Sequence, residues 1–586
     1  MVWLCVGLLG LTGYIGNGVA EENGAPAPSR SAIEVRLHGL DDPEVHANVQ
    51  NHLPLYRHRE RTDLSAEDIR RFHARSGPAI RRGLEPFGYY RPEYTASLEP
   101  TSDGWRAEYR VDPGPRVSVD DVTLRISGPA AELNALREWQ RDYPLKAGEP
   151  LEHSVHDDAL RRLDRIAREH GLFDARFEER AIRVDAEATS ARITIHFETG
   201  PRYRMGETTF RGSDLSSSLL DRFRSYEPGD PFRTGNLLQL QRDLSDTGYF
   251  QRVEVTPMPA EETRTPIAVD LVDQPPTRYT AGIGYGTDTG PRISGGIERR
   301  YLNRHGHRAG INVELSTIRQ ELGAGYTIPL DDPRHEALST RLSRVESETD
   351  TSELVQWKAR IALARVRGRW LRTVSLSAEQ EDYTIGEEEA RSRLVLPGIA
   401  WRNLNRPTSS GERRRTRRLG LELRGASEGL ASDASLFQIR ARAGESIPLD
   451  VAERHRLVGR LDLGATAVED IAALPASLRF FTGGDRSIRG YSYQSLGPDD
   501  DNGDVIGGQH LAVFGLDYEY SVRGNLATAL FHDIGSAFGP DSPVFHRGAG
   551  IGMRWYLPVG ALALDLARPL KKESSWRFHL SLRAEL

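Results

Sequence analysis

Residues 480–493 read FFTGGDRSIRGYSY, and the interpretation of the whole chain depends on this stretch. It lies between two segments of strand-like composition and has the length of a long loop. Loops that face water seldom carry aromatic pairs such as Tyr491 and Tyr493, and loops of this length usually have a function. The composition therefore predicts a loop that folds back into the protein, with Ile488-Arg489-Gly490-Tyr491 at its centre.

Length and composition exclude several classes of protein. The chain has 586 residues, which is long for one domain and predicts several. Hydrophobic residues make up 38%, mean hydropathy is −0.51, and no apolar run after the N-terminus reaches the roughly 18 residues of a membrane-spanning helix. Membrane-spanning strands remain allowed, because only alternate residues face lipid. The net charge of −7 is spread along the chain, so nucleic acid is not an expected partner.

The N-terminal residues resemble an export signal. Trp3–Leu11 is short and apolar, and small residues lead up to Ala20, where we expect cleavage after residues 1–20. The only cysteine, Cys5, lies inside this segment. The mature chain would then lack cysteine, which excludes disulfides, thiol catalysis and cysteine metal sites.

A pattern of about 80 residues recurs three times before residue 275. Each copy has an amphipathic helix that ends in glycine and an aromatic or Leu-Phe pair, followed by extended segments. The expected units are residues 31–114, 115–199 and 200–274, each with the order strand, helix, helix, strand, strand. Three unrelated small α/β domains would be the less specific interpretation.

Residues 275–586 predict a transmembrane barrel, with room for about sixteen strands. The end of the chain alternates between apolar and polar residues. An apolar face opposite a fully polar face indicates lipid on one side and a hydrated lumen on the other. The apolar face of this last strand comprises Trp576, Phe578, Leu580 and Leu582.

The first strand of this region is expected to be weak. Tyr279 begins an alternation whose other face carries Gly282, Gly284 and Gly286, and glycine weakens strands. A nucleotide-binding loop is a poor alternative for these glycines, because no helix follows them. If the first and last strands close the barrel, they form a seam that can open and expose a pairing edge.

These features resemble the Omp85 family of outer-membrane proteins. Ile488, Arg489, Gly490 and Tyr491 match the family's Val/Ile-Arg-Gly-Phe/Tyr loop tip, and the repeated units are similar to its POTRA domains. Three units with a Glu585-Leu586 ending resemble the TamA branch. The resemblance implies an α+β and all-β membrane fold, with three tandem POTRA-like domains followed by a 16-stranded transmembrane β-barrel.

The resemblance also implies a latch inside the barrel. A guanidinium in a barrel lumen needs carboxylates, to which it can bond in a bidentate manner. In the family, the tip arginine bonds to an aspartate in an Asp-x-Gly segment and to a glutamate one strand earlier. Asp533 and Glu519 occupy those places here, so we expect both to contact Arg489. Either carboxylate could instead be a solvated lumenal charge.

No catalytic machinery or cofactor is expected. The acidic run of residues 499–504 invites a calcium interpretation, but its glycine is out of step with the EF-hand pattern, and a turn is favoured. No metalloprotease, P-loop or nucleophile-elbow motif occurs in the sequence. The sequence therefore predicts a protein that is not an enzyme and binds no metal.

The resemblance implies a location in the outer membrane of a Gram-negative bacterium, with the N-terminal domains in the periplasm. The implied function is insertion of β-barrel proteins such as autotransporters, with phospholipid transport as a further role. The implied partners are a large TamB-like protein anchored in the inner membrane, unfolded barrel clients and outer-membrane lipid. The alternatives are an export pore of the two-partner-secretion type and a passive porin.

Overall fold

The computed structural model describes residues 32–259, 262–404, 416–450, 452–557, 560–571 and 575–585. The expected export signal, residues 1–20, lies outside these residues. The chain forms two compact units, one of residues up to Arg204 with Pro231–Thr234, and one of Met205–Asp230 with the chain from Gly235 onward. Among the described residues, no helix combines the length and the apolar character needed to cross a membrane.

The first small domain contains more helices than the expected pair. The first helix ends at His52. Leu53, which follows it and precedes Pro54, has an extended backbone, because proline disfavours the helical conformation in the residue before it. A capping box formed by Ser65 and Asp68 then starts another helix. The elements are β1 (Ala32–His38), α1 (Pro43–His52), α2 (Pro54–Arg57), α3 (Ala66–Ala74), α4 (Ser76–Leu84), a 3-10 turn η1 (Glu85–Phe87), β2 (Glu93–Thr101) and β3 (Gly104–Asp112).

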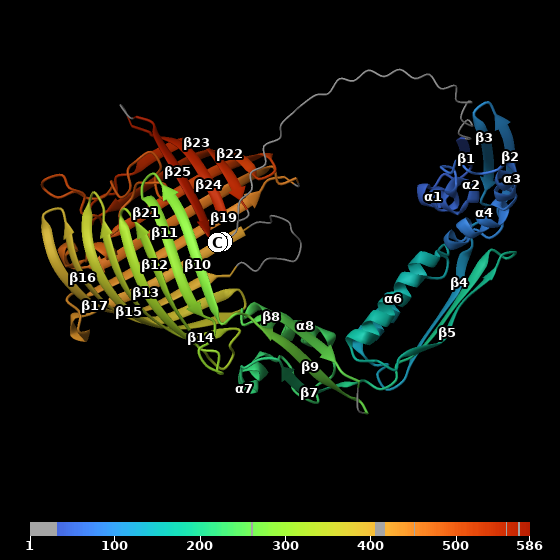
Figure 1. The fold of residues 1–586 in the computed structure, drawn as a ribbon, viewed down its shortest axis with the longest axis horizontal. Helices are drawn as coiled ribbons and strands as arrows, with labels where there is room; N and C mark the ends of the chain where they lie inside the picture. Colours follow the sequence, from blue (N-terminus) through green and yellow to red (C-terminus); the bar gives the residue numbers. More distant parts are fainter. Residues whose placement is uncertain are drawn as a thin grey trace, which may run out of the picture. The chain divides into compact units, whose positions relative to one another are not determined.

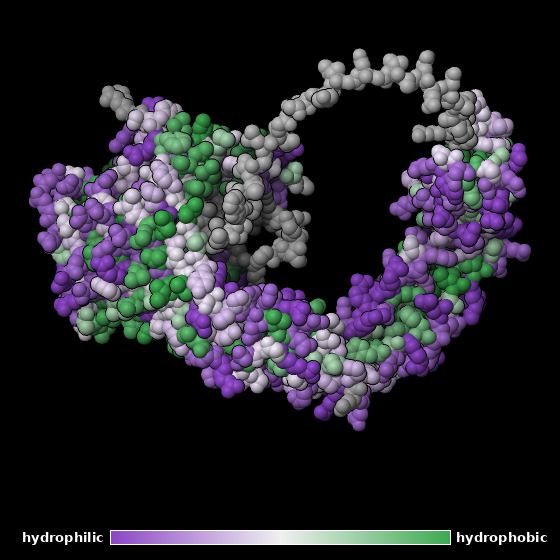
Figure 2. All heavy atoms as spheres, in the orientation of Figure 1, coloured by the Kyte–Doolittle hydropathy of each residue, from purple (hydrophilic) through white to green (hydrophobic). Residues whose placement is uncertain are grey.

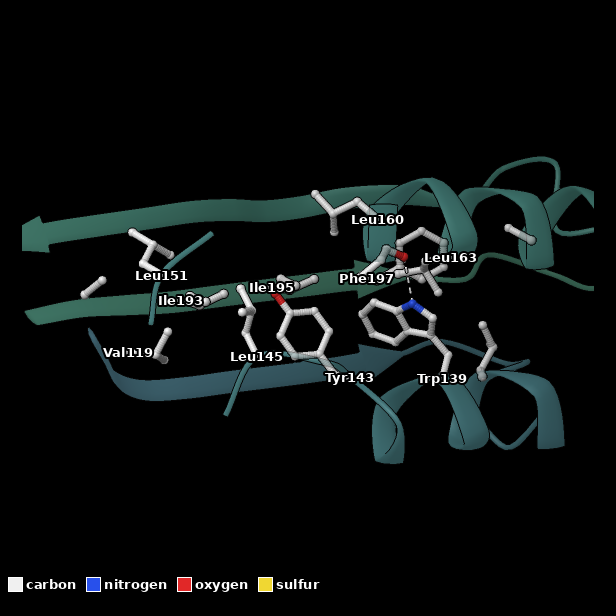
Figure 3. Close-up of a cluster of buried hydrophobic side chains, with 14 of the residues drawn as sticks. Val119, Trp139, Tyr143, Leu145, Leu151, Leu160, Leu163, Ile193, Ile195 and Phe197 are labelled. Atoms are coloured by element: carbon white, nitrogen blue, oxygen red, sulfur yellow. Dashed lines mark hydrogen bonds between the residues drawn. The ribbon is translucent and has the colours of Figure 1, made fainter. Parts of the chain in front are cut away.

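The second small domain has the expected order of one strand, two helices and two strands. Its core lies between the sheet and the two helices, and Trp139 is fully enclosed there (Figure 3). The Trp139 indole N–H donates to the carbonyl oxygen of Ala159 at 2.8 Å, which satisfies the one polar group of the ring. The elements are β4 (Ser118–Ser127), α5 (Asn134–Arg141), α6 (His153–Glu169), β5 (Arg176–Asp185) and β6 (Ser190–Glu198).

The third small domain contains β7 (Arg204–Arg211), α7 (Ser217–Leu220), a 3-10 turn η2 (Asp221–Phe223), α8 (Thr234–Asp246), β8 (Phe250–Pro257) and β9 (Arg264–Asp273). All three small sheets share one topology. Their strand orders are β1-β3-β2, β4-β6-β5 and β7-β9-β8, so the last strand of each domain lies in the centre. The first and second strands of each domain are therefore the edges of its sheet.

The remaining strands, β10 to β25, form a closed barrel of sixteen strands (Figure 1). Large apolar side chains such as Tyr279, Ile297 and Leu376 point outward from its wall, and Figure 2 shows apolar patches on this surface. The strands are β10 (Thr277–Gly286), β11 (Gly290–Arg299), β12 (Arg308–Ser316), β13 (Arg319–Pro329), β14 (Glu336–Glu348), β15 (Ser352–Arg367), β16 (Trp370–Ile385), β17 (Glu388–Asn403), β18 (Thr416–Ala426), β19 (Leu436–Pro448), β20 (His455–Val468), β21 (His510–Arg523), β22 (Leu526–Phe538), β23 (His546–Leu557), β24 (Gly560–Pro569) and β25 (Arg577–Glu585).

Candidate functional site

The long segment between β20 and β21 folds into the barrel. Isolated backbone bridges join Phe480 to Gly508 and Thr482 to Leu496, which gives the segment a defined shape. Ile488 is fully buried and Arg489 is 2% exposed. We call residues 479–509 the lumenal loop, and Ile488–Tyr491 its tip.

Arg489 at the tip is surrounded by three aspartates on three strands. Its Nε and Nη2 atoms donate to the two carboxylate oxygens of Asp533 at 2.7 and 2.9 Å. Nη2 and Nη1 also donate to the two oxygens of Asp517 at 2.6 and 3.1 Å. Nη1 further contacts Asp565 at 3.3 Å, and the guanidinium lies 3.5 Å from the centre of the Phe531 ring. The tip is thus bonded to β21, β22 and β24 through one side chain.

Two more arginines complete this cluster. Arg554 on β23 donates to both oxygens of Asp565, and its Nη2 lies 3.3 Å from Asp517. Arg460 on β20 donates to Asp533 at 2.7 Å. Three guanidinium groups therefore face three carboxylates, and Asp533 is completely buried. Buried charges need such pairing, because an unpaired ion in the protein interior is costly.

The structure brings Arg489 and Asp533 together, but the expected contact between Arg489 and Glu519 is wrong. Glu519 accepts hydrogen bonds from Arg456 Nε at 3.0 Å and from the Tyr556 hydroxyl at 3.1 Å. Asp517 takes the expected place beside Arg489. Residues two apart on one face of a strand are separated by about 6–7 Å, so a short guanidinium contact can reach only one of them.

The other tip residues have distinct environments. Gly490 has φ of 97°, and a Cβ there would lie 2.9 Å from the backbone nitrogen of Pro569, so only glycine fits without strain. Tyr491 packs edge-on against His546, with ring centroids 5.5 Å apart. The backbone N–H of Gly490 donates to Nε2 of His579 on β25 at 3.1 Å.

The first and last barrel strands, β10 and β25, meet along a short ladder that we call the seam. The pairs run from Gly282–Glu585 to Gly286–Ser581 and include Gly284–Arg583 and Tyr285–Leu582. Beyond this ladder, the Thr287 N–H donates to the Leu580 carbonyl oxygen at 3.0 Å. Gly282, Gly284, Gly286, Leu580 and Leu582 therefore lie at the seam.

The remaining residues expected at the seam lie beside it. Tyr279 is in the first half of β10, where it pairs with Ile297 of β11 and is 73% exposed. Phe578 pairs with Leu566 of β24, and Trp576 precedes β25, which begins at Arg577. Both aromatic side chains face outward, as residues in contact with lipid would.

The contacts of the loop and the seam include groups that sequence reasoning did not assign. Asp517, Asp565 and His579 all fall on the polar face of alternating strands, and that pattern was a usable signal for their inward direction. Asp500 forms the turn expected for the acidic run, because its Oδ1 accepts the N–H groups of Asn502 and Asp504, each at 2.9 Å. Across the described ranges, no cluster of three or more His, Cys, Asp or Glu side chains has the arrangement of a metal site.

Two parts of the chain match known domains. Residues 302–582 match the Omp85 superfamily domain, and residues 34–113 match the POTRA domain described as TamA domain 1. Among curated proteins, the outer membrane protein assembly factor BamA of Nitratidesulfovibrio vulgaris (strain Hildenborough) is 25% identical over 379 residues, which cover 60% of this chain and 47% of that relative. The chain thus spans about half the length of this relative.

Two solved structures are similar to this chain to different degrees. BamA from Haemophilus ducreyi lacking POTRA domains 1-3 has a TM-score of 0.67 at 17% identity, covering 80% of this chain and 100% of that one. CdiB from Acinetobacter baumannii has a TM-score of 0.47 at 14% identity, covering 81% and 90%. The first likeness confirms the expected fold class of small α/β domains followed by a 16-stranded barrel. The chain therefore carries an Omp85 superfamily domain at residues 302–582, preceded by a TamA-type POTRA domain at residues 34–113.

Proposed function

We propose that this protein is an outer-membrane assembly factor that inserts β-barrel proteins by opening the seam between β10 and β25. The observation that carries the proposal is the short seam ladder, from Gly282–Glu585 to Gly286–Ser581, beside a lumenal loop held by ion pairs. Opening so short a ladder exposes two strand edges, and a free edge is a template for another strand. The Omp85 superfamily domain supports an outer-membrane location, with the small domains in the periplasm.

The small domains supply surfaces suited to unfolded clients. In each sheet the second strand is an edge, and β2 is exposed along nearly its whole length. An extended chain can add to such an edge through main-chain hydrogen bonds, which require little sequence specificity. This property suits a receptor for many different barrel precursors, including autotransporters.

Within this class we favour the TamA-like role. Three small sheets precede the barrel, and the first domain matches a TamA-type POTRA. This role includes a large TamB-like partner anchored in the inner membrane and a further part in phospholipid transport. Affinity purification of the tagged protein from its own membranes tests the partner. Recovery of a secreted client in place of an inner-membrane partner would favour the export-pore alternative.

A reversible lock tests the opening of the seam. Tyr285 and Leu582 are register partners, so a Tyr285→Cys/Leu582→Cys pair in a Cys5→Ser background can be joined by a disulfide. The matched control is Ile361→Cys/Leu376→Cys, a register pair between β15 and β16 whose side chains also face outward. We expect the oxidised seam pair to lose insertion of a barrel client into proteoliposomes and to regain it on reduction.

The control pair should insert the client equally well whether oxidised or reduced. Full insertion by the oxidised seam pair would overturn the proposed mechanism. Equal inhibition by both locks would show that the disulfides act on barrel rigidity in general, and it would count against a special role for the seam.

A further inference from the structure

His579 lies at the meeting point of the seam and the lumenal loop. It belongs to β25, the last strand, and it is 2% exposed. On one side its Nε2 accepts the backbone N–H of Gly490, at the loop tip. On the other side its Nδ1 lies 3.4 Å from Oδ2 of Asp288. One imidazole thus touches two segments that are far apart in the sequence.

Asp288 extends this contact to the other side of the seam. It sits in the turn that joins β10 to β11, and its side chain is 3% exposed. The same Oδ2 atom accepts the backbone N–H of Asp485, a second residue of the lumenal loop, at 2.8 Å. The loop therefore meets the first hairpin at Asp485 and the last strand at Gly490.

The hydrogen bond that His579 accepts determines which ring nitrogen carries the proton in the neutral imidazole. Nε2 must carry a lone pair to accept from Gly490, so in the neutral ring the proton is on Nδ1. Nδ1 lies 3.4 Å from Oδ2 of the Asp288 carboxylate, a close polar contact without the angle of a hydrogen bond. The arrangement places an acceptor nitrogen toward Gly490 and a second polar nitrogen toward Asp288 on opposite sides of the same side chain, which an apolar residue cannot supply.

The strongest contacts of the tip lie on one side of the seam. Arg489 bonds to β21, β22 and β24, and Arg577 of β25 donates to Ser492 at 2.7 Å. These bonds hold the loop against the last strands, but they do not involve β10. Asp288 is the point at which the loop reaches the β10–β11 hairpin.

We propose that His579 and Asp288 form a clasp through which the lumenal loop keeps the seam closed. His579 acts as a positioning residue: it fixes the Gly490 backbone and places its Nδ1 beside Asp288, in the hairpin that carries β10. Displacement of the loop tip removes the Nε2 bond and frees the imidazole to leave Asp288, so release of the loop and opening of the seam are coupled. The clasp deepens the proposed function, since it rests on a seam that opens.

Hydrogen exchange of the full-length protein in lipid nanodiscs tests the clasp. The measured quantity is the exchange rate of amides in residues 277–286 and 577–585, which reports the equilibrium between closed and open seam. His579→Phe keeps an aromatic ring, slightly larger than imidazole, but has no donor or acceptor. We expect its seam amides to exchange about fivefold faster, the change that loss of roughly one net hydrogen bond produces in an equilibrium constant.

Two further variants make the result specific. His579→Gln retains one acceptor and one donor, so it should restore slow exchange. His532→Phe is the matched control, because His532 is an exposed histidine on the wall strand β22. Exchange in β15 and β16 should be the same in all variants. If His579→Phe does not fold, Asp288→Ala replaces it with the same expected result.

Unchanged seam exchange in His579→Phe, or faster exchange spread evenly over the whole barrel, would overturn the clasp. So would a failure of His579→Gln to restore protection. The disulfide lock separates this result from the proposed function: a locked seam that still inserts clients refutes the insertion mechanism, while the exchange data decide the clasp alone.

Discussion

Two junctions between neighbouring barrel strands are closed in different ways: the seam between β10 and β25, and the junction between β15 and β16, which we call the wall. β15 and β16 pair along their whole lengths, from Ser352–Ile385 to Arg367–Trp370. At the seam, the residues that the structure describes pair the second half of β10 with β25, from Gly282 to Gly286. The lumenal loop adds side-chain contacts beside this short ladder, including those of His579 and Arg577.

This difference determines how each junction can open. A long main-chain ladder opens only if many hydrogen bonds break together, and in lipid every unsatisfied backbone group costs several kcal/mol. A short ladder supported by side chains can lose its supports one at a time. The proposed function therefore assigns the change of state to the seam and not to the wall.

The largest expected effect comes from removing the centre of the loop contacts. Arg489→Ala takes one partner from each of three carboxylates, two of which are buried, so the barrel should lose about 3–5 kcal/mol of unfolding free energy. Urea unfolding of the barrel in lipid vesicles, followed by heat-modified gel mobility, measures this loss. Amide hydrogen exchange should become faster at the seam and in the lumenal loop before it becomes faster in β15 and β16.

Arg489→Lys is the control, because it keeps the charge but lacks the planar fork that binds two carboxylates. The unfolding free energy of Arg489→Lys should lie between that of the alanine variant and that of the natural protein. An alanine variant as stable as the natural protein would show that the loop contributes nothing to closure, and the contrast between seam and wall would then rest on the ladder alone.

A smaller effect should distinguish Asp533 from Glu519, the two carboxylates that the sequence predicted as partners of Arg489. Asp533→Asn weakens a direct partner of Arg489, whereas Glu519→Gln weakens a pair between Arg456 and Glu519 on neighbouring strands. We expect both variants to lose stability, by about 1–3 kcal/mol each. Only Asp533→Asn should speed amide hydrogen exchange in the lumenal loop, residues 479–509. Equally fast exchange of this loop in Glu519→Gln would contradict the assignment of Glu519 to Arg456.

Distance measurements would test the comparison without disturbing charge. Spin labels at Tyr285 and Leu582 report the seam, and labels at Ile361 and Leu376 report the wall. We expect a single narrow distance distribution at the wall and a broader one, with a longer-distance component, at the seam. Equally narrow distributions in the presence of an unfolded client would argue against a seam that opens.

The smallest expected effect is that of pH on the stability of the second small domain. It distinguishes an acid response of the small domains from one of the barrel. Burial lowers the pKa of His156 in the second small domain, where its Nδ1 lies 2.7 Å from the Tyr143 hydroxyl. The unfolded chain therefore binds a proton at higher pH than the folded domain does. Stability should fall as pH drops below about 6.5, by at most about 1.4 kcal/mol per pH unit.

Hydrogen exchange of residues 115–199 between pH 7 and pH 5 measures this slope. His156→Gln keeps an acceptor for the Tyr143 hydroxyl and does not titrate, so its slope should be smaller. An identical slope in the variant would assign the acid response of this domain to other groups.

Most of the fold could be predicted from the sequence, because it depends on local patterns. The alternation of Phe578, Leu580 and Leu582 defines β25, and the repeated glycine–aromatic helix ends mark the small domains. The extra helices of the first domain were missed, since they depend on a proline break at Pro54 and a capping box at Ser65 within one polar stretch.

The candidate site was predicted only in part, for a geometric reason. Alternation shows which face of a strand a residue occupies, so the inward direction of Asp533 and Asp565 follows from the sequence. Alternation does not show how far along the barrel axis a loop tip reaches. That depth determines whether Arg489 contacts Asp517 or Glu519, which lie on the same face of β21. The role of Asp288 depends on closure of the first hairpin against the last strand, which no local pattern reveals.

The strand order of the small domains has a consequence for how they are made. In the first two domains the opening strand pairs in parallel with the closing strand, and Ala32 with Gly104 and Ser118 with Ser190 are each 72 residues apart. Synthesis delivers both edge strands before the central one that joins them. Each domain therefore completes its sheet only when its last ten or so residues emerge, and a chain that stops short of them has two strands with nothing between them to pair with.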